Sequence, residues 1–227
     1  GSPTYAHLHL LDTMAKDPQN AMALLMQVWK PAVAAVKRDV AEMQKVIDKE
    51  QGKNKFKLAA WDYRYYAEKL RKAKFDLDLN EVKPYLQVEN LREAMFWVAN
   101  QIYGFSFVEV KGVPVFHPDV RVYQVKARDG HHVGLWYFDP YARQGKRSGA
   151  WMNAMREQQR MTGDVPTIVS NNSNFIKGAD GAPVTISWGD AETMFHEFGH
   201  ALHGLNSNVT YPSLSGTNTM RDNVEFP

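Results

Sequence analysis

The hydrophobic pattern changes its period near residue 105, and this change constrains the fold more than any other feature of the sequence. Before it, apolar residues recur at the spacing of one face of an amphipathic helix. The longest such stripe comprises Met22, Leu25, Val28, Trp29, Val33, Val36, Val40, Met43 and Ile47. From Phe105 onward, apolar and polar residues alternate, as in half-buried strands. Helices followed by a small antiparallel or mixed sheet predict an α+β fold that is mainly α.

Helices are expected throughout the first hundred residues. Asp17 followed by Pro18 is typical of an N-cap and first helical turn. Pro31 lies inside the long stripe and is expected to kink or restart the helix, because proline removes a backbone donor. Further helices are expected in AAWDYRYYAEKLRKAKF and in ENLREAMFWVANQIYG, the second closed by Gly104 as a C-cap.

The middle of the chain predicts strands. They are expected in FSFVEV, VRVYQVKA, HHVGLWYFDPY and PTIVSNNSNF, with Asp129-Gly130 as a hairpin turn. RSGAWMNAMREQQRM is expected to form a short helix or an ordered excursion, and AETMFHEFGHALHGL another helix. The chain therefore divides into a helical region (1–104), a small sheet with loops (105–190), and a region (191–227) that holds the last predicted helix and the start of another.

Composition limits the partners. The 27 basic and 25 acidic residues leave a net charge of +2, which gives no electrostatic reason to expect nucleic acid or an anionic membrane. No apolar run reaches the roughly 18 residues of a membrane-spanning helix. The first residues, GSPTYAHLHLL, lack the features of a signal peptide, so we expect a cytoplasmic protein, with the periplasm as the alternative. Cysteine is absent, so any metal must be held by nitrogen and oxygen ligands.

An H-E-x-x-H motif, His196-Glu197-Phe198-Gly199-His200, is the strongest chemical signal. On a helix, positions i and i+4 project from one face, so both imidazoles can reach one ion. Zn²⁺ suits such ligands, and it lowers the pKa of a bound water to about 7. Glu197 lies at the edge of the same face, where its carboxylate would serve as a general base without binding the metal.

A catalytic zinc site also requires a third protein ligand and an open fourth position. The candidates after the motif are His203, Asp222 and Glu225. His203 would have to bend back toward the ion, so we interpret it as a supporting or packing residue. DNVEFP is typical of the first turn of a helix that could present Glu225, while Asp222 could hydrogen-bond a ligating imidazole and fix its orientation. The residues by themselves leave both carboxylates open as ligands.

Two smaller features carry expectations of their own. Gly199 inside a helix costs about 1 kcal/mol relative to alanine, which predicts that the helix packs closely against another backbone there. His131 and His132 are adjacent on a predicted strand and therefore face opposite sides. We interpret them as a polar hairpin end rather than as an additional metal site.

Several segments of the sequence resemble a known family. FHEFGHALHGL followed by LSGTNTMRDNVEFP resembles the thimet oligopeptidase family of zinc metallopeptidases, and within it the bacterial dipeptidyl carboxypeptidases. WDYRYYAEKLRKAKFDLD, LWYFDPYARQGKRSGAWM and NNSNFIKGADGAPVTISWGD are similar to the same family, in the same order. The likeness covers essentially the whole chain and roughly the middle third of a family member.

The resemblance implies a function and a ligand set. It makes His196, His200 and Glu225 the zinc ligands and Glu197 the general base, and so selects Glu225 over Asp222. It implies a zincin-like, mostly helical fold with a small sheet beside the zinc helix, and a channel that admits short unstructured peptides. The expected reaction is the release of dipeptides from a free C-terminus.

The same resemblance implies that this chain is an incomplete catalytic domain. The family's substrate-contacting residues follow VEFP, so the missing C-terminal part of the same polypeptide is an expected partner, and we expect impaired activity without it. NNSN at 171–174 is less apolar than expected for the family's strand. The alternatives are a non-catalytic zinc-binding or interaction fragment and an endopeptidase of the thermolysin type.

Overall fold

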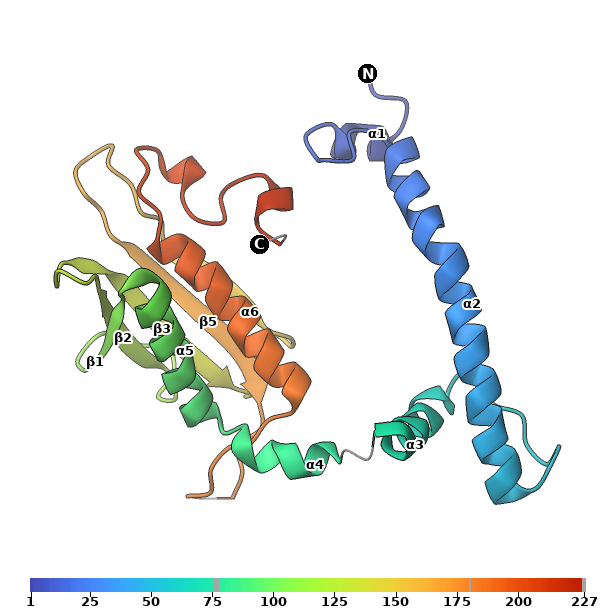
Figure 1. The fold of residues 1–227 in the computed structure, drawn as a ribbon. Coiled ribbons are helices and arrows are strands. Elements are labelled where there is room, and N and C mark those ends of the chain that lie inside the picture. The colour runs from blue at the N-terminus through green and yellow to red at the C-terminus, as the bar shows by residue number, and fades with distance from the viewer. Residues whose placement is uncertain (76–77, 180, 226–227) are drawn as a thin grey trace. The chain divides into compact units, whose positions relative to one another are not determined.

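A computed structural model describes residues 1–75, 78–179 and 181–225, which form two compact units, Gly1–Glu81 and Val82–Pro227 (Figure 1). The first unit is helical, with α1 (Tyr5–Leu10), α2 (Pro18–Gln51), α3 (Tyr63–Phe75) and, at its end, α4 (Leu79–Val82). The second contains η1 (Lys83–Tyr85), α5 (Val88–Tyr103), β1 (Ser106–Val110), β2 (Arg121–Lys126), β3 (His132–Tyr141), β4 (Trp151–Arg156), β5 (Thr167–Phe175), α6 (Trp188–Leu205), η2 (Pro212–Leu214) and η3 (Arg221–Asn223). The predicted α+β class is confirmed. None of the described helices combines the length and hydropathy needed to span a bilayer.

In the first unit, the start of α2 agrees with its sequence signal. The Asp17 side chain caps the helix by accepting a hydrogen bond from the Asn20 N–H at 2.8 Å. The helix continues through Pro31, so the expected restart is wrong. One missing backbone bond does not end a long helix whose bonds propagate on both sides. Only the later part of the apolar stripe is buried: Met43 and Ile47 pack with Tyr66 of α3.

The second unit is built on a five-stranded sheet with the order β1-β2-β3-β5-β4. β1, β2 and β3 pair antiparallel, β3 and β5 pair parallel, and β4 pairs antiparallel with β5 at the edge. The predicted hairpin is confirmed, with Gly130 at φ +87° between β2 and β3. The expectation of a short helix or excursion after Arg147 is wrong, because Trp151–Arg156 forms β4. The backbone hydrogen bonds of β4 are made with β5, and local sequence propensity does not reveal such a long-range pairing.

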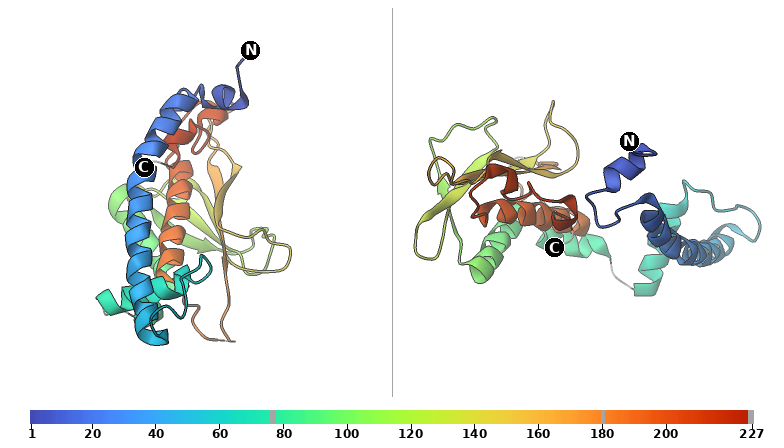
Figure 2. Two further views of the ribbon diagram at one scale, coloured as in Figure 1. Left: turned by 90° about the vertical axis from the view of Figure 1, so that its right-hand side faces the viewer. Right: turned by 90° about the horizontal axis from the view of Figure 1, so that it is seen from above.

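Helices α5 and α6 lie side by side over one face of this sheet (Figures 1 and 2). The core between the layers is aromatic. Trp136 of β3 is fully buried and meets the ring of Phe198 of α6 edge-on, with the ring centroids 5.4 Å apart. Such edge-to-face pairs add to the stabilisation from burial alone. The packing places α6 mainly on β5 and β4, with further contacts to β3.

A capping box fixes the start of α6. Ser187 Oγ accepts the Asp190 N–H at 3.1 Å, and the Asp190 carboxylate accepts the Ser187 N–H at 3.1 Å. The close backbone approach expected at Gly199 is wrong: a Cβ there would meet no atom of another element within 4 Å in the described part of the chain. The close approach is at Gly204 instead, where a Cβ would lie 2.9 Å from Val169 Cγ1.

A buried ion cluster organises the connection from β3 to β4. Asp139 is only 1% exposed and receives two hydrogen bonds from Arg143, at 2.7 and 3.0 Å. Lys146 Nζ donates to the carbonyls of Asp139 at 2.8 Å and Tyr141 at 2.9 Å. Burial lowers the pKa of Lys146, and hydrogen bonding to Asp139 opposes this. The cluster folds the loop 142–150 back on the sheet, immediately before the edge strand begins.

We predict that Asp139→Asn destabilises the chain by about 3–5 kcal/mol, because it leaves the buried ammonium group of Lys146 and the partly exposed guanidinium of Arg143 without their anion. Asp129→Asn is the matched control. The side chain of Asp129 is 74% exposed in its pair with His131, so its loss should leave the free energy of unfolding nearly unchanged. Urea unfolding measures both free energies. Equal effects of the two substitutions would contradict the structural role of the cluster.

Gly199 and Gly204 of α6 give a second, paired prediction. Gly204→Ala should destabilise the chain by about 1–3 kcal/mol, since the new methyl would overlap the stiff Val169 side chain. Gly199→Ala should stabilise it by up to about 1 kcal/mol, the helix propensity difference. Thermal unfolding of both variants checks the signs. A destabilising Gly199→Ala would restore the original expectation of close packing at that position.

Candidate metal centre

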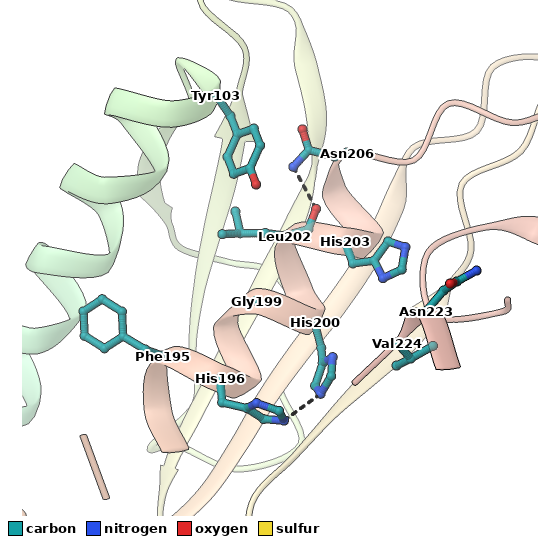
Figure 3. A pocket seen from close by; sticks show the side chains of 10 residues that line it. All are labelled: Tyr103, Phe195, His196, Gly199, His200, Leu202, His203, Asn206, Asn223 and Val224. Carbon is teal, nitrogen blue, oxygen red and sulfur yellow. Dashed lines mark hydrogen bonds between the residues drawn. The ribbon is translucent and has the colours of Figure 1, made fainter. Parts of the chain in front are cut away.

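The two histidines of the motif lie one turn apart on α6 and point toward one another. Their Nε2 atoms are 3.0 Å apart, and a dashed line marks this contact in Figure 3. The His196 side chain is 51% exposed and that of His200 only 13% exposed. The exposed face of α6 therefore offers two imidazole nitrogens to a single point in space.

The carboxylate of Glu225 completes this group. After α6 the chain returns through η2 and η3, and Glu225 Oε2 lies 3.4 Å from His196 Nε2 and 3.6 Å from His200 Nε2. Of the described residues, these three form the cluster capable of holding a metal ion. A tetrahedral ion with bonds of about 2.0–2.1 Å places its ligand atoms about 3.3 Å apart. The three measured separations bracket that value, so the residues fit a small tetrahedral cation such as Zn²⁺.

Backbone contacts hold the return segment near α6. Gly216, at φ +53°, approaches so closely that a Cβ would lie 3.0 Å from the Cα of Gly204. Its N–H donates to Ser207 Oγ at 2.6 Å. Farther back, the Gln158 carboxamide accepts the Val209 N–H at 2.8 Å and donates to the Val209 carbonyl at 3.2 Å. These contacts bring a residue that follows α6 by twenty positions within reach of the histidines.

Glu197 is placed differently from the three clustered residues. It is 9% exposed, lies outside the cluster, and lines a pocket of about 280 Å³ shared with all three of them and the start of β4. Burial raises the pKa of the Glu197 carboxyl, while the nearby His200 and His196 rings and a hydrogen bond from the Met152 N–H oppose this rise. A carboxylate beside the site but not part of it is suited to proton transfer.

The remaining predicted site residues lie near the cluster without joining it. Asp222 is in η3, three positions before Glu225. His203 lines a second pocket of about 550 Å³, together with Tyr103, Phe195 and both histidines of the motif (Figure 3). A new helix was expected at DNVEFP, but the described residues there form only a 3₁₀ turn, Arg221–Asn223. The last two residues of DNVEFP, 226–227, lie outside the described residues.

One residue beside the site was missed. Asn171 of β5 is 5% exposed, and its carboxamide hydrogen-bonds the main-chain oxygen of Glu197. The only sequence signal was the unexpected polarity of NNSN at 171–174. Buried asparagines in a strand require partners, but the sequence does not identify them. The register of β5 under α6 supplies that information.

The fold and the site define a class: an α+β chain in which an H-E-x-x-H helix and a later glutamate converge on one point. Residues 1–227 match Peptidase family M3, so the chain belongs to this family, and the predicted resemblance is confirmed. The chain is 45% identical over 228 residues to dipeptidyl carboxypeptidase of Salmonella typhimurium and 43% identical over 228 residues to that of Escherichia coli. Both alignments cover 100% of this chain and 33% of the relative. Oligopeptidase A of Escherichia coli is 30% identical over 230 residues, covering 100% of this chain and 34% of the relative. The chain thus spans about a third of the length of these curated relatives.

The raised pKa of Glu197 predicts a pH-dependent effect on stability. Below the ordinary carboxyl pKa of 4.5, folded and unfolded chains both carry the proton, and Glu197 contributes nothing. As the pH rises through the interval between 4.5 and the higher folded pKa, the unfolded chain loses its proton first, so stability falls. Glu197→Gln should therefore stabilise the metal-free chain at pH 7 but not at about pH 4.

Urea unfolding of the metal-free chain and the Glu197→Gln variant, at both pH values, measures this difference. Glu192→Gln, an exposed substitution on the same helix, is the control and should show no comparable pH-dependent gain. A Glu197→Gln variant that is less stable at pH 7 would contradict the cost assigned to burial of the charged carboxylate.

Proposed function

We propose that the polypeptide containing this chain is a zinc-dependent peptidase that hydrolyses short peptides and releases dipeptides from their C-termini. The observation that carries the proposal is the convergence of His196, His200 and Glu225, with the separate carboxylate of Glu197 in the same pocket. Membership of Peptidase family M3 and similarity to proteins named dipeptidyl carboxypeptidase support it. The proposal includes a zincin-like arrangement of the catalytic helix and sheet.

In this proposal, His196, His200 and Glu225 hold the ion. When bound, Zn²⁺ supplies Lewis acidity that polarises a carbonyl and makes a coordinated water more acidic. The exposed side chains of His196 and Glu225 leave an approach for substrate from solvent. The more buried His200 ties the ion to the body of α6.

Glu197 acts as the proton carrier. Its carboxylate accepts a proton from the attacking water and delivers it to the nitrogen of the leaving amine. Burial supports this role, because a raised pKa brings the protonated form closer in energy to the ionised form at neutral pH. Met152 of β4 lines the pocket beside this carboxylate.

The substrate is proposed to lie along β4. This strand is at the edge of the described sheet, and its first residues, Trp151 and Met152, line the pocket that contains Glu197. An edge strand can pair with an extended peptide through main-chain hydrogen bonds, independently of the side-chain sequence. Such pairing favours short unstructured peptides over folded proteins.

The chain covers about a third of its relatives, so we propose that other parts of the same polypeptide provide further substrate contacts and stabilise the developing oxyanion. Each such donor is typically worth about 2.7–4 kcal/mol in the transition state. On this proposal, the 227 residues by themselves bind zinc but hydrolyse peptides slowly.

We predict that Glu197→Gln in the complete polypeptide leaves the zinc content at one per chain and lowers kcat by about 10²–10⁴-fold, the usual contribution of a positioned acid–base group. A fluorescence-quenched peptide measures turnover, and elemental analysis measures zinc. Glu192→Gln, exposed on the same helix, is the control and should retain both. Undiminished turnover in Glu197→Gln would remove Glu197 from its role.

Product analysis separates the alternatives. Mass spectrometry of a digested peptide should show successive loss of C-terminal dipeptides. Internal cleavage of peptides with a blocked C-terminus would favour an endopeptidase of the thermolysin type. Stoichiometric zinc without any turnover in the complete polypeptide would favour a non-catalytic zinc-binding or interaction protein.

A further inference from the structure

The carboxamide of Asn171 connects the aromatic core to the turn of α6 that carries Glu197. Its Oδ1 accepts a hydrogen bond from Trp136 Nε1 at 2.6 Å, and its Nδ2 donates to the main-chain oxygen of Glu197 at 2.5 Å. Asn171 is 5% exposed and Trp136 fully buried, so water does not compete for either bond. The Trp136 contact fixes which end of the carboxamide faces the helix.

Helix formation does not require this second bond. A carbonyl inside an α-helix already accepts the N–H four residues later, so the Glu197 oxygen receives an additional donor from another element. An asparagine at a core position is unfavourable unless its polar atoms are paired. An apolar side chain would fill the same place without that requirement. The contact therefore points to a role in orientation.

Met152 lies beside the side chain of Glu197. It is the register partner of Asn171 across the β4–β5 ladder, and it lines the same pocket as Glu197. Two residues that are paired on adjacent strands thus lie beside the main chain and the side chain of the same glutamate. By contrast, the close contact of α6 with β5 near its C-terminal end, Gly204 against Val169, is apolar and carries no directional preference.

We propose that Asn171 is a positioning residue for Glu197. By fixing the turn of α6 against β5, it places the Glu197 carboxylate at the β4 edge, beside the metal cluster rather than in it. The inference rests on the proposed role of Glu197 as the proton carrier. Asn171 itself touches neither the cluster nor the pocket of Glu197 among the described residues.

The substitutions separate positioning from stability. Asn171→Asp keeps the acceptor for Trp136 but turns an oxygen toward the Glu197 carbonyl, and Asn171→Leu removes both bonds. Thr167→Val is the matched control: Thr167 is also on β5, is 1% exposed, and donates one buried hydrogen bond to the Arg156 carbonyl at 2.9 Å. Its loss should affect stability without moving Glu197.

In the complete polypeptide, we expect Asn171→Leu and Asn171→Asp to retain one zinc per chain and to keep KM within about 2-fold, with kcat lowered about 10–100-fold. Thr167→Val should keep wild-type kcat. Because Asn171 acts through Glu197, Asn171→Leu combined with Glu197→Gln should be no slower than Glu197→Gln alone. Unchanged kcat in both Asn171 variants, or independent losses in the double variant, would overturn the proposal.

A second measurement needs neither metal nor turnover. In the metal-free 227-residue chain, NMR should show the Asn171 carboxamide protons protected from exchange, with a coupling across the hydrogen bond to the Glu197 carbonyl. Rapid exchange would overturn the proposal even if the Asn171 variants fail to fold. Failure of the proposed function is distinguishable, because Glu197→Gln would then leave turnover unchanged while the Asn171 carboxamide stays protected.

Discussion

The packing of α6 on β4 and β5 is the constraint on which the rest of the site depends. The buried face of the helix meets the aromatic core at Phe198, so the opposite face must carry His196 and His200 outward. The glycine contact at Gly204 brings the returning chain against the same helix, and Glu225 then reaches the two imidazoles. The packing of one helix thereby brings together three side chains that could hold a metal ion and that no single segment contains.

Polar groups inside this core are costly to bury, and two of them have structural roles beside the site. Asp139 forms ion pairs with Arg143 and Lys146 and so positions the loop that precedes the edge strand β4. Asn171 joins the core to the turn at Glu197. Buried polar groups contribute orientation only when all their partners are in place. Both are fixed on the central strands, and both bear on β4 or α6, the elements that line the pocket of Glu197.

Sequence reasoning succeeded where the signal was local. The Asp17 cap, the Gly104 C-cap and the turn at Gly130 depend on a few neighbouring residues, and each was predicted correctly. It failed where the determinant was distant. β4 exists because β5 lies beside it, and the close approach of α6 falls at Gly204 because Val169 is opposite. The residues alone left the third ligand open, since nothing in local spacing brings a carboxylate back to the helix.

The central claim is that His196, His200 and Glu225 bind one zinc ion, and X-ray absorption at the zinc edge of the reconstituted chain tests it most directly. The account predicts two imidazole nitrogens and one carboxylate oxygen at about 2.0–2.2 Å. Glu225→Ala should remove the carboxylate contribution and weaken binding, whereas Asp222→Ala should keep both nitrogens and the carboxylate. A zinc spectrum unaltered by Glu225→Ala, or one with a single imidazole in the unmodified chain, would contradict the account.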